Sequence, residues 1–221
     1  MAATNSTTFP LVVPAQRTSR DLLEPLVVFA TILLVLWLPT RLQLVVGPVV
    51  LLTPLALTLW RGATLNSLGL GWRGLLRSLW ILPAAVGLAM ASMYLARIFG
   101  TLHPLYQAEF GHVGGYVLWT LYQQFLLQGY FMPRLCRALN RDAGIAATAV
   151  LFALAHLPNL PLTIATLVWG VVSCLLFRRY RSLYVLGLAQ GLLGLCCAVC
   201  VPDAMIHHMR VGLGYTQYHA S

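Results

Sequence analysis

The chain has 221 residues, of which 59% are hydrophobic and 9% are charged, and its mean hydropathy is +0.80. A soluble domain of this length carries more charge, so the composition excludes that class. All 14 basic side chains are arginines, against five acidic ones, which gives a formal net charge of +9. We therefore predict an integral membrane protein and interpret the positive charge as a consequence of topology rather than as a nucleic-acid surface.

Long runs without a charged residue predict the membrane spans. Because about 20 apolar residues cross a bilayer, these runs predict seven helices, over 22–38, 43–60, 76–98, 115–133, 143–157, 161–177 and 182–201. The fifth and sixth helices share one long run, which Pro158, Asn159 and Pro161 divide by a turn. The predicted fold class is an all-α, polytopic membrane helix bundle with about seven transmembrane helices.

The arginines are divided unequally between the two ends of this predicted bundle. Eleven lie at the end that carries the N-terminal segment, and the three at the other end are Arg41, Arg97 and Arg210. The positive-inside rule then places the N-terminus in the cytoplasm and the C-terminus outside, and we expect a bacterial inner membrane. The chain divides into a polar cytoplasmic N-terminal segment, 1–20, the transmembrane bundle, 21–201, and an interfacial or outer tail, 202–221.

The segment 61–77 joins the second and third predicted spans. It contains Leu-Gly-Leu-Gly at 68–71, followed by Trp72 and Arg73. We predict that it lies at the membrane surface, with Trp72 at the level of the lipid headgroups.

The span 115–133 contains three glutamines and no charge. An unpaired amide away from water costs about 1–3 kcal/mol, so the side chains of Gln123, Gln124 and Gln128 need partners. Gln124 and Gln128 lie on one helix face, and Gln123 lies on a neighbouring face. Since one lipid-facing helix cannot hide both faces, we predict that this span is central. The glutamines can serve as hydrogen-bonding contacts between helices, or they can contact a substrate.

Two later segments carry polar or small residues at helical spacing. Phe152 and His156 share one face of the fifth span, and Gln190 and Gly194 share one face of the last span. The Gly-x-x-x-Gly of 187–191 predicts close contact with another helix. His156 can also be read as an ordinary buried histidine beside the turn, and Gln190 as a packing residue.

In order and spacing, these segments resemble the CPBP family of intramembrane peptidases, also called the CAAX-protease or Abi family. That family carries E-E-x-x-x-R on one helix, F-x-x-x-H on the next and H-x-x-x-N/D on a later one. The matching positions are Gln123, Gln124 and Gln128 for the first motif, Phe152 and His156 for the second, and Gln190 and Gly194 for the third. The resemblance covers about 115–200 and implies hydrolysis of a peptide bond in a membrane-associated substrate.

The resemblance also implies roles for individual residues. The catalytic positions are His156, Gln123, Gln124 and Gln190, and the substrate-binding positions are Gln128, Phe152, Gly194 and Tyr122. We expect no cofactor and no metal ligands. The three charged residues of the first motif are all glutamines here, which indicates a concerted change to a neutral hydrogen-bond network.

This change leaves two functions open. A glutamine amide cannot accept a proton at physiological pH, and general-base catalysis contributes roughly 10²–10⁴-fold, so an endopeptidase of this kind has altered or lost activity. The alternative is a non-catalytic scaffold or binding protein that holds a membrane-bound peptide or protein in the same cleft. A small transporter is less favoured because the sequence contains no inverted repeat.

Histidines and carboxylates gather at the predicted outer end of the bundle. Asp203 and His207 would share a helix face if 203–209 is helical, and such a pair can bind Zn²⁺ or relay protons. An ordinary polar loop explains the same residues. The sequence leaves open whether Glu109, His112, Asp203 and His207 form a site there.

Overall fold

The computed structural model of the protein describes residues 19–106 and 110–218, and these contain helices and no strand. The longer helices are α1 (Ser19–Leu36), α2 (Thr40–Trp60), α4 (Ile81–Ile98), α5 (Phe110–Gln124), α7 (Arg141–Leu154), α8 (Leu160–Tyr180) and α9 (Leu183–Cys200). The shorter ones are α3 (Trp72–Ser78), the π-helix η1 (Phe125–Phe131), α6 (Met132–Ala138), α10 (Asp203–Ile206), the 3₁₀ turn η2 (His207–Met209) and α11 (Leu213–Thr216). Almost all of the predicted segment 1–20 lies outside the described residues.

Polar side chains begin three of the helices. Asn140 accepts hydrogen bonds from the backbone N–H groups of Asp142 and Ala143 at the start of α7. Asn159 caps α8 and Ser182 caps α9 in the same way. A cap of this kind satisfies N–H groups that have no partner within the helix, which is typically worth about 1 kcal/mol. The predicted turn between 157 and 161 is therefore confirmed, and Asn159 ends it.

The seven predicted spans correspond to α1, α2, α4, α5 with η1, α7, α8 and α9. Four of these, α2, α4, α8 and α9, are long and apolar enough to cross a membrane by length and composition. The first turns of α1 contain Arg20, Asp21 and Glu24, while α5 and α7 have 15 and 14 residues. The all-α membrane bundle is confirmed, and seven is an approximate count of its spans.

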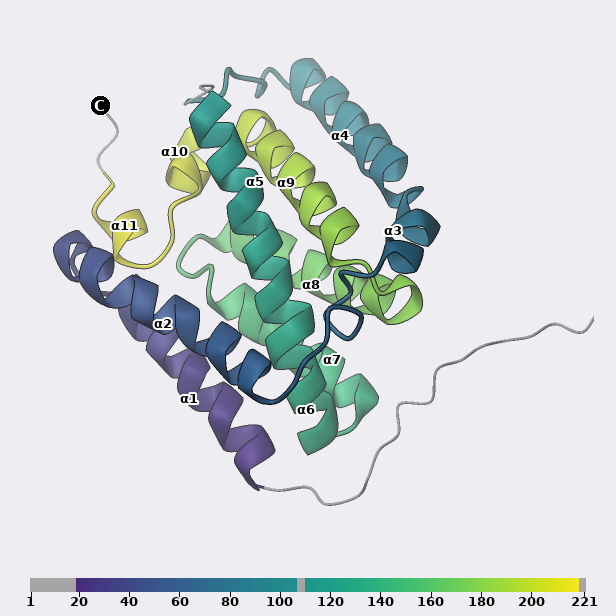
Figure 1. Ribbon diagram of the computed structural model, residues 1–221. Helices are drawn as coiled ribbons and strands as arrows, with labels where there is room; N and C mark the ends of the chain where they lie inside the picture. The colour runs from purple at the N-terminus through teal and green to yellow at the C-terminus, as the bar shows by residue number, and fades with distance from the viewer. Residues whose placement is uncertain (1–18, 107–109, 219–221) are drawn as a thin grey trace, which may run out of the picture.

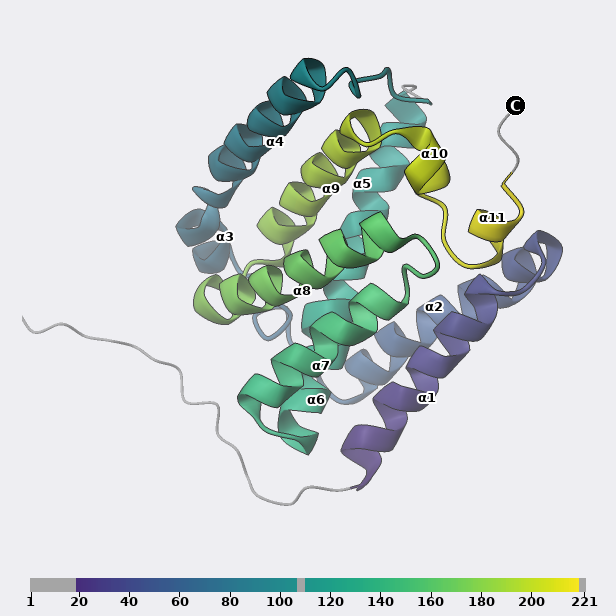
Figure 2. The ribbon, with the colours of Figure 1, turned by 180° about the vertical axis from the view of Figure 1, so that it is seen from behind.

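Helices α1 and α2 form one group and the other long helices form a second group, and the two groups meet at η1 and α6. Figure 1 shows α1 and α2 side by side along one edge, with α5, α9 and α4 beyond them. Figure 2 turns the molecule round and brings α7 and α8 to the front, where they pack on each other. Helix α9 packs against both α4 and α5, so it lies inside the bundle.

The contact between α5 and α9 depends on small residues. A Cβ at Gly187 would lie 2.5 Å from Leu121 Cδ2, and a Cβ at Gly191 would lie 3.1 Å from Thr120 Oγ1. Thr120 also donates a hydrogen bond to the Gly187 carbonyl at 3.0 Å. The predicted Gly-x-x-x-Gly contact therefore occurs, and it brings the polar residues of α9 close to those of α5.

The span that carries the glutamines is central in its second half. Every residue of η1 is buried, and Tyr130 is completely enclosed. The first half is more open, since Leu118 and Trp119 are exposed. The prediction of a central span is confirmed for the part of the helix that contains Gln124 and Gln128.

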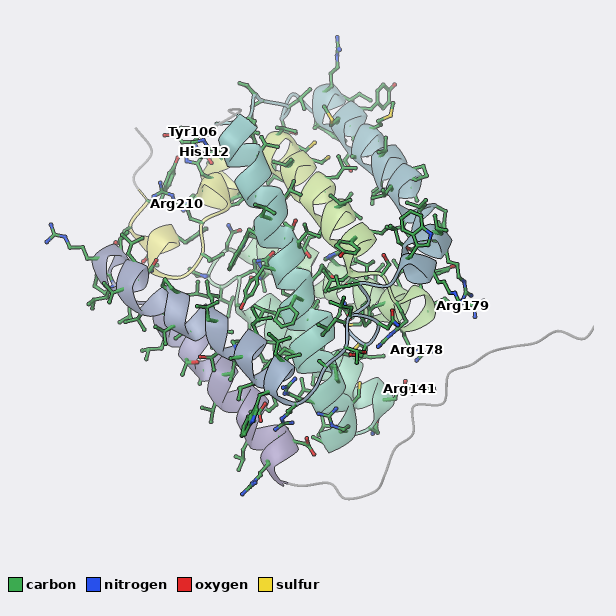
Figure 3. All side chains as sticks on the ribbon, viewed as in Figure 1. Tyr106, His112, Arg141, Arg178, Arg179 and Arg210 are labelled. Carbon is green, nitrogen blue, oxygen red and sulfur yellow. The ribbon has the colours of Figure 1, made fainter. Side chains whose placement is uncertain are left out.

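The four arginines labelled in Figure 3 lie at two ends of the bundle. Figure 3 places Arg141, Arg178 and Arg179 at one end and Arg210 at the opposite end, beside α10 and α11. Which of these ends faces the cytoplasm stays a prediction from the positive-inside rule.

Candidate functional site

Four glutamines from two helices are joined by hydrogen bonds in the interior of the bundle. Gln124 Nε2 donates to Gln190 Oε1 at 2.6 Å, and Gln190 Nε2 donates to Gln123 Oε1 at 2.6 Å. Gln128 Nε2 donates to Gln124 Oε1 at 3.3 Å. Gln124 and Gln128 are fully buried, and Gln190 is 9% exposed. We call these four side chains the glutamine network.

Helix α8 completes the glutamine network. Trp169 Nε1 donates to Gln190 Oε1 at 3.1 Å, and Gln128 Nε2 also donates to Ser173 Oγ at 3.3 Å. The amide NH₂ groups of Gln128, Gln124 and Gln190 therefore each donate to the next glutamine oxygen, and the series ends at Gln123, which accepts. Such a chain of polarised bonds fixes the orientation of every side chain within it.

One acceptor of the glutamine network has no partner. Gln128 Oε1 is buried and forms no hydrogen bond with any described residue. A buried carbonyl oxygen without a donor costs about 1–3 kcal/mol, so this atom is suited to accept a hydrogen bond from a bound group. The backbone supplies the reason for its position, because Gln128 lies in the π-helix η1, whose wider turn rotates its side chains relative to α5.

His156 lies at the end of α7 and makes a different contact. Its Nδ1 lies 2.7 Å from the carbonyl oxygen of Phe152, and the two rings meet edge to face with centroids 4.9 Å apart. A carbonyl only accepts, so Nδ1 carries the proton. In the neutral ring, Nε2 is then the atom that can accept a proton from another group. Within the described ranges, His156 forms no hydrogen bond with a glutamine of the network.

The remaining predicted site residues lie around the network without joining it. Tyr122 donates its hydroxyl to the Leu51 carbonyl of α2 and stacks on Trp119. Phe152 is buried. Gly194 lies so close to Tyr116 that a Cβ would overlap its hydroxyl oxygen. Two surface pockets of the described chain lie elsewhere, and neither is lined by a glutamine of the network.

The sequence reasoning missed an ion-pair cluster next to the site. Glu24 Oε1 accepts from Arg134 Nε at 2.7 Å and from the Tyr130 hydroxyl at 3.3 Å, and its second oxygen pairs with Arg61. Arg134 is 3% exposed, its guanidinium stacks on Tyr130 at 3.9 Å, and burial lowers its pKa. The two partners are 110 residues apart in sequence, and only the presence of charges in mostly apolar segments could have indicated them.

The condition for an Asp203–His207 pair on one helix face, a helix over 203–209, is not met. Helix α10 ends at Ile206 because His207 adopts a left-handed conformation, with φ of 45°. Asp203 instead accepts from the His208 backbone N–H at 2.6 Å and from the Tyr218 hydroxyl at 2.5 Å. Burial raises the pKa of Asp203, but these two hydrogen bonds outweigh it and hold the pKa below its usual value. Glu109 lies outside the described residues.

The ring of His207 packs between aromatic side chains. Its centroid lies 4.1 Å from Tyr215 and 4.8 Å from Tyr218. The exposed residue His112 is near Tyr106 in Figure 3. Among residues 19–106 and 110–218, no group of three or more His, Cys, Asp or Glu side chains is arranged to hold a metal ion.

Comparison with known proteins identifies the part of the chain that carries the glutamine network. Residues 110–196 match the family model of the type II CAAX prenyl endopeptidase Rce1-like proteins. Over these residues the chain is similar to that family. All eight predicted site residues lie within the matched segment, which confirms the resemblance that the spacing indicates. No curated protein and no solved structure matches the chain.

The match over 110–196 and the four apolar helices together support an integral membrane protein. The matched segment runs from the start of α5 to within the last two turns of α9. It therefore contains both helices that supply the glutamine network and the turn that carries His156.

Proposed function

We propose that this Rce1-like protein binds a membrane-associated peptide at the glutamine network. It holds the peptide without the hydrolysis that a glutamate general base would catalyse. The observation that carries the proposal is a set of neutral amides that bond to one another at the positions where the resemblance implies charges: Gln124 and Gln190 at 2.6 Å, and Gln190 and Gln123 at 2.6 Å. Amides bind peptide groups well, because they offer both a donor and an acceptor, but they cannot remove a proton from water.

The unpartnered Gln128 Oε1 supports a bound group that donates a hydrogen bond. A peptide N–H is such a group, and a membrane-embedded peptide strand has N–H groups that need partners because no water reaches them. The network lies inside the bundle, between α5, α8 and α9, where polar residues of membrane helices often mark a functional site.

Cleavage is a second candidate function, and the geometry of His156 favours it. The bond from Nδ1 to the Phe152 carbonyl leaves Nε2 as a proton acceptor. Neutral amide N–H groups can stabilise a developing oxyanion, and such a donor contributes roughly 10²–10³-fold in other enzymes. An endopeptidase that uses His156 as its base would therefore retain part of the rate of a glutamate-dependent one.

The test uses the full chain in lipid vesicles with a prenylated CAAX peptide, the substrate class named for the matched family. The peptide retained by the protein and any cleaved product are measured together by mass spectrometry. We expect retention without cleavage, and at least about a tenfold loss of retention in Gln190→Leu, because Trp169 and Gln124 lose their acceptor.

Gln43→Leu is the matched control, since Gln43 donates to the Leu38 carbonyl outside the network. It should retain the peptide as the unmodified chain does. Cleavage that disappears in His156→Ala while retention persists would establish the second candidate instead. Equal retention by vesicles with and without the protein would overturn both.

A further inference from the structure

The short helix α3 is fastened across the end of α8. Gly74 lies so close to the Arg181 carbonyl that a Cβ would overlap it, so the two backbones touch. The rings of Trp80 and Tyr180 meet edge to face, with centroids 5.8 Å apart. Arg181 Nη2 also donates to the Ser67 carbonyl at 2.6 Å. These contacts hold α3 against the end of α8 (Figure 1).

This packing gathers five exposed arginines from two elements. We call them the arginine corner: Arg73, Arg77, Arg178, Arg179 and Arg181. Arg178 Nη1 lies 3.9 Å from Asp142 Oδ1, and the Asp142 side chain is 81% exposed. Arg73, Arg77 and Arg179 form no ion pair with any residue of the described ranges. Among the described residues, the five positive charges of the arginine corner therefore face one acidic partner, Asp142.

Large apolar side chains stand beside these charges. Trp72 is 68% exposed, Trp80 is 50% exposed, and Leu76 and Leu79 are also exposed. Tryptophan beside arginine at the end of an apolar helix is typical of the membrane–water interface, where the ring lies at the headgroup level. The predicted position of 61–77 at the membrane surface is consistent with this arrangement. An anionic ligand of the arginine corner would therefore be a component of the membrane surface.

We infer that the arginine corner binds the phosphate of an anionic phospholipid headgroup, with the acyl chains against Trp72 and Leu76. A guanidinium group pairs with phosphate oxygens through two parallel hydrogen bonds, which makes arginine well suited to this ligand. The exposed apolar side chains give a lipid a second contact that a water-soluble phosphate cannot use. This inference is independent of the function proposed for the glutamine network.

The experiment titrates the purified full chain in detergent with dioctanoyl phosphatidylglycerol and follows tryptophan fluorescence. Dioctanoyl phosphatidylcholine and glycerol phosphate are the comparison ligands, because the first lacks net charge and the second lacks acyl chains. We expect saturable binding of phosphatidylglycerol only. In Arg73→Gln with Arg77→Gln, affinity should fall by roughly tenfold to thirtyfold, since each arginine near an anionic surface contributes roughly fivefold.

The matched control is Arg41→Gln with Arg97→Gln, which removes the same charge. Arg41 lies in the first turn of α2 and Arg97 in the last turn of α4, each at the end of its helix away from α3. The control should bind as the unmodified chain does. An equal loss in both double variants would overturn the inference, as would unchanged binding after the Arg73 and Arg77 changes. Equal binding of glycerol phosphate would overturn the assignment to a lipid.

Discussion

Restoring charge to the glutamine network tests whether its geometry is that of a charged site. The changes are Gln124→Glu and Gln128→Arg, alone and together. Gln128 Nε2 lies 3.3 Å from Gln124 Oε1, and both side chains are fully buried. At that separation, opposite unit charges attract by about 5 kcal/mol for an effective dielectric constant near 20. Desolvation offsets part of this attraction, so we expect a coupling energy of about 3 kcal/mol between the two positions.

Each single change should destabilise the fold by about 3–5 kcal/mol, because it leaves a buried charge without a partner. The carboxylate introduced at position 124 has an additional cost. Gln124 Nε2 now donates to Gln190 Oε1 at 2.6 Å, and a carboxylate oxygen in its place would face another oxygen. Gln190 could turn its amide round only by giving up its bonds with Trp169 and Gln123.

The assay is the melting temperature of the four purified proteins in one detergent. For a chain of this length, 1 kcal/mol shifts the melting temperature by about 2–4 °C. The double variant should therefore melt about 6–12 °C above the value expected from adding the two single losses. The control cycle joins Gln123→Glu with Gln128→Arg, because Gln123 bonds to Gln190 and not to Gln128. Coupling should be smaller there, and additive losses in both cycles would refute the reasoning.

Three further predictions concern the ends of the bundle. Glu24→Gln should lower stability by about 3–5 kcal/mol, measured by thermal melting, because it removes the acid that pairs with buried Arg134; an unchanged melting temperature would show that the pair contributes nothing. The lowered pKa of Asp203 means that its carboxylate stabilises the folded tail above about pH 4, and this contribution is lost as the pH falls through the lowered pKa. Asp203→Asn should remove that part of the pH dependence of melting, and a profile identical to that of the unmodified chain contradicts the prediction. Reporter fusions at the two chain ends should report opposite sides of the membrane, with the N-terminus in the cytoplasm. Two reporters on the same side would mean an even number of membrane crossings, which contradicts seven spans.

The sequence alone predicts the helices well because charge and apolar length decide membrane insertion. The runs without a charged residue indicate the seven predicted spans, and Asn159 between two prolines marks the turn before α8. The sequence could not predict that the helix from 110 would widen into the π-helix η1, because no local propensity distinguishes it from an α-helix. The same limit applies to α10, where backbone conformation at His207 ended the helix.

The candidate site was predictable in its members but not in its bonds. Spacing placed Gln124 and Gln128 on one face, and the family resemblance added Gln190 from a distant helix. Which amide donates to which depends on side-chain positions across helices, and so does the participation of Trp169 and Ser173. The Glu24–Arg134 pair was missed because its members approach only through the packing of α1 on α6.

The position of that ion pair bears on what the glutamine network can do. Arg134 follows Gln128 by six residues, about 9 Å along the helical axis, so the carboxylate that pairs with it is not part of the network. Glu24 is held by Arg134 and Arg61 together, so both of its carboxylate oxygens are already engaged by guanidinium groups. Under the second candidate function, the proton acceptor that we propose is His156 Nε2, since Nδ1 is engaged by the Phe152 carbonyl. Hydrogen bonding by amides and proton transfer by one imidazole are separable by mutation, so loss of peptide retention should follow changes in the glutamines while loss of any cleavage should follow changes in His156.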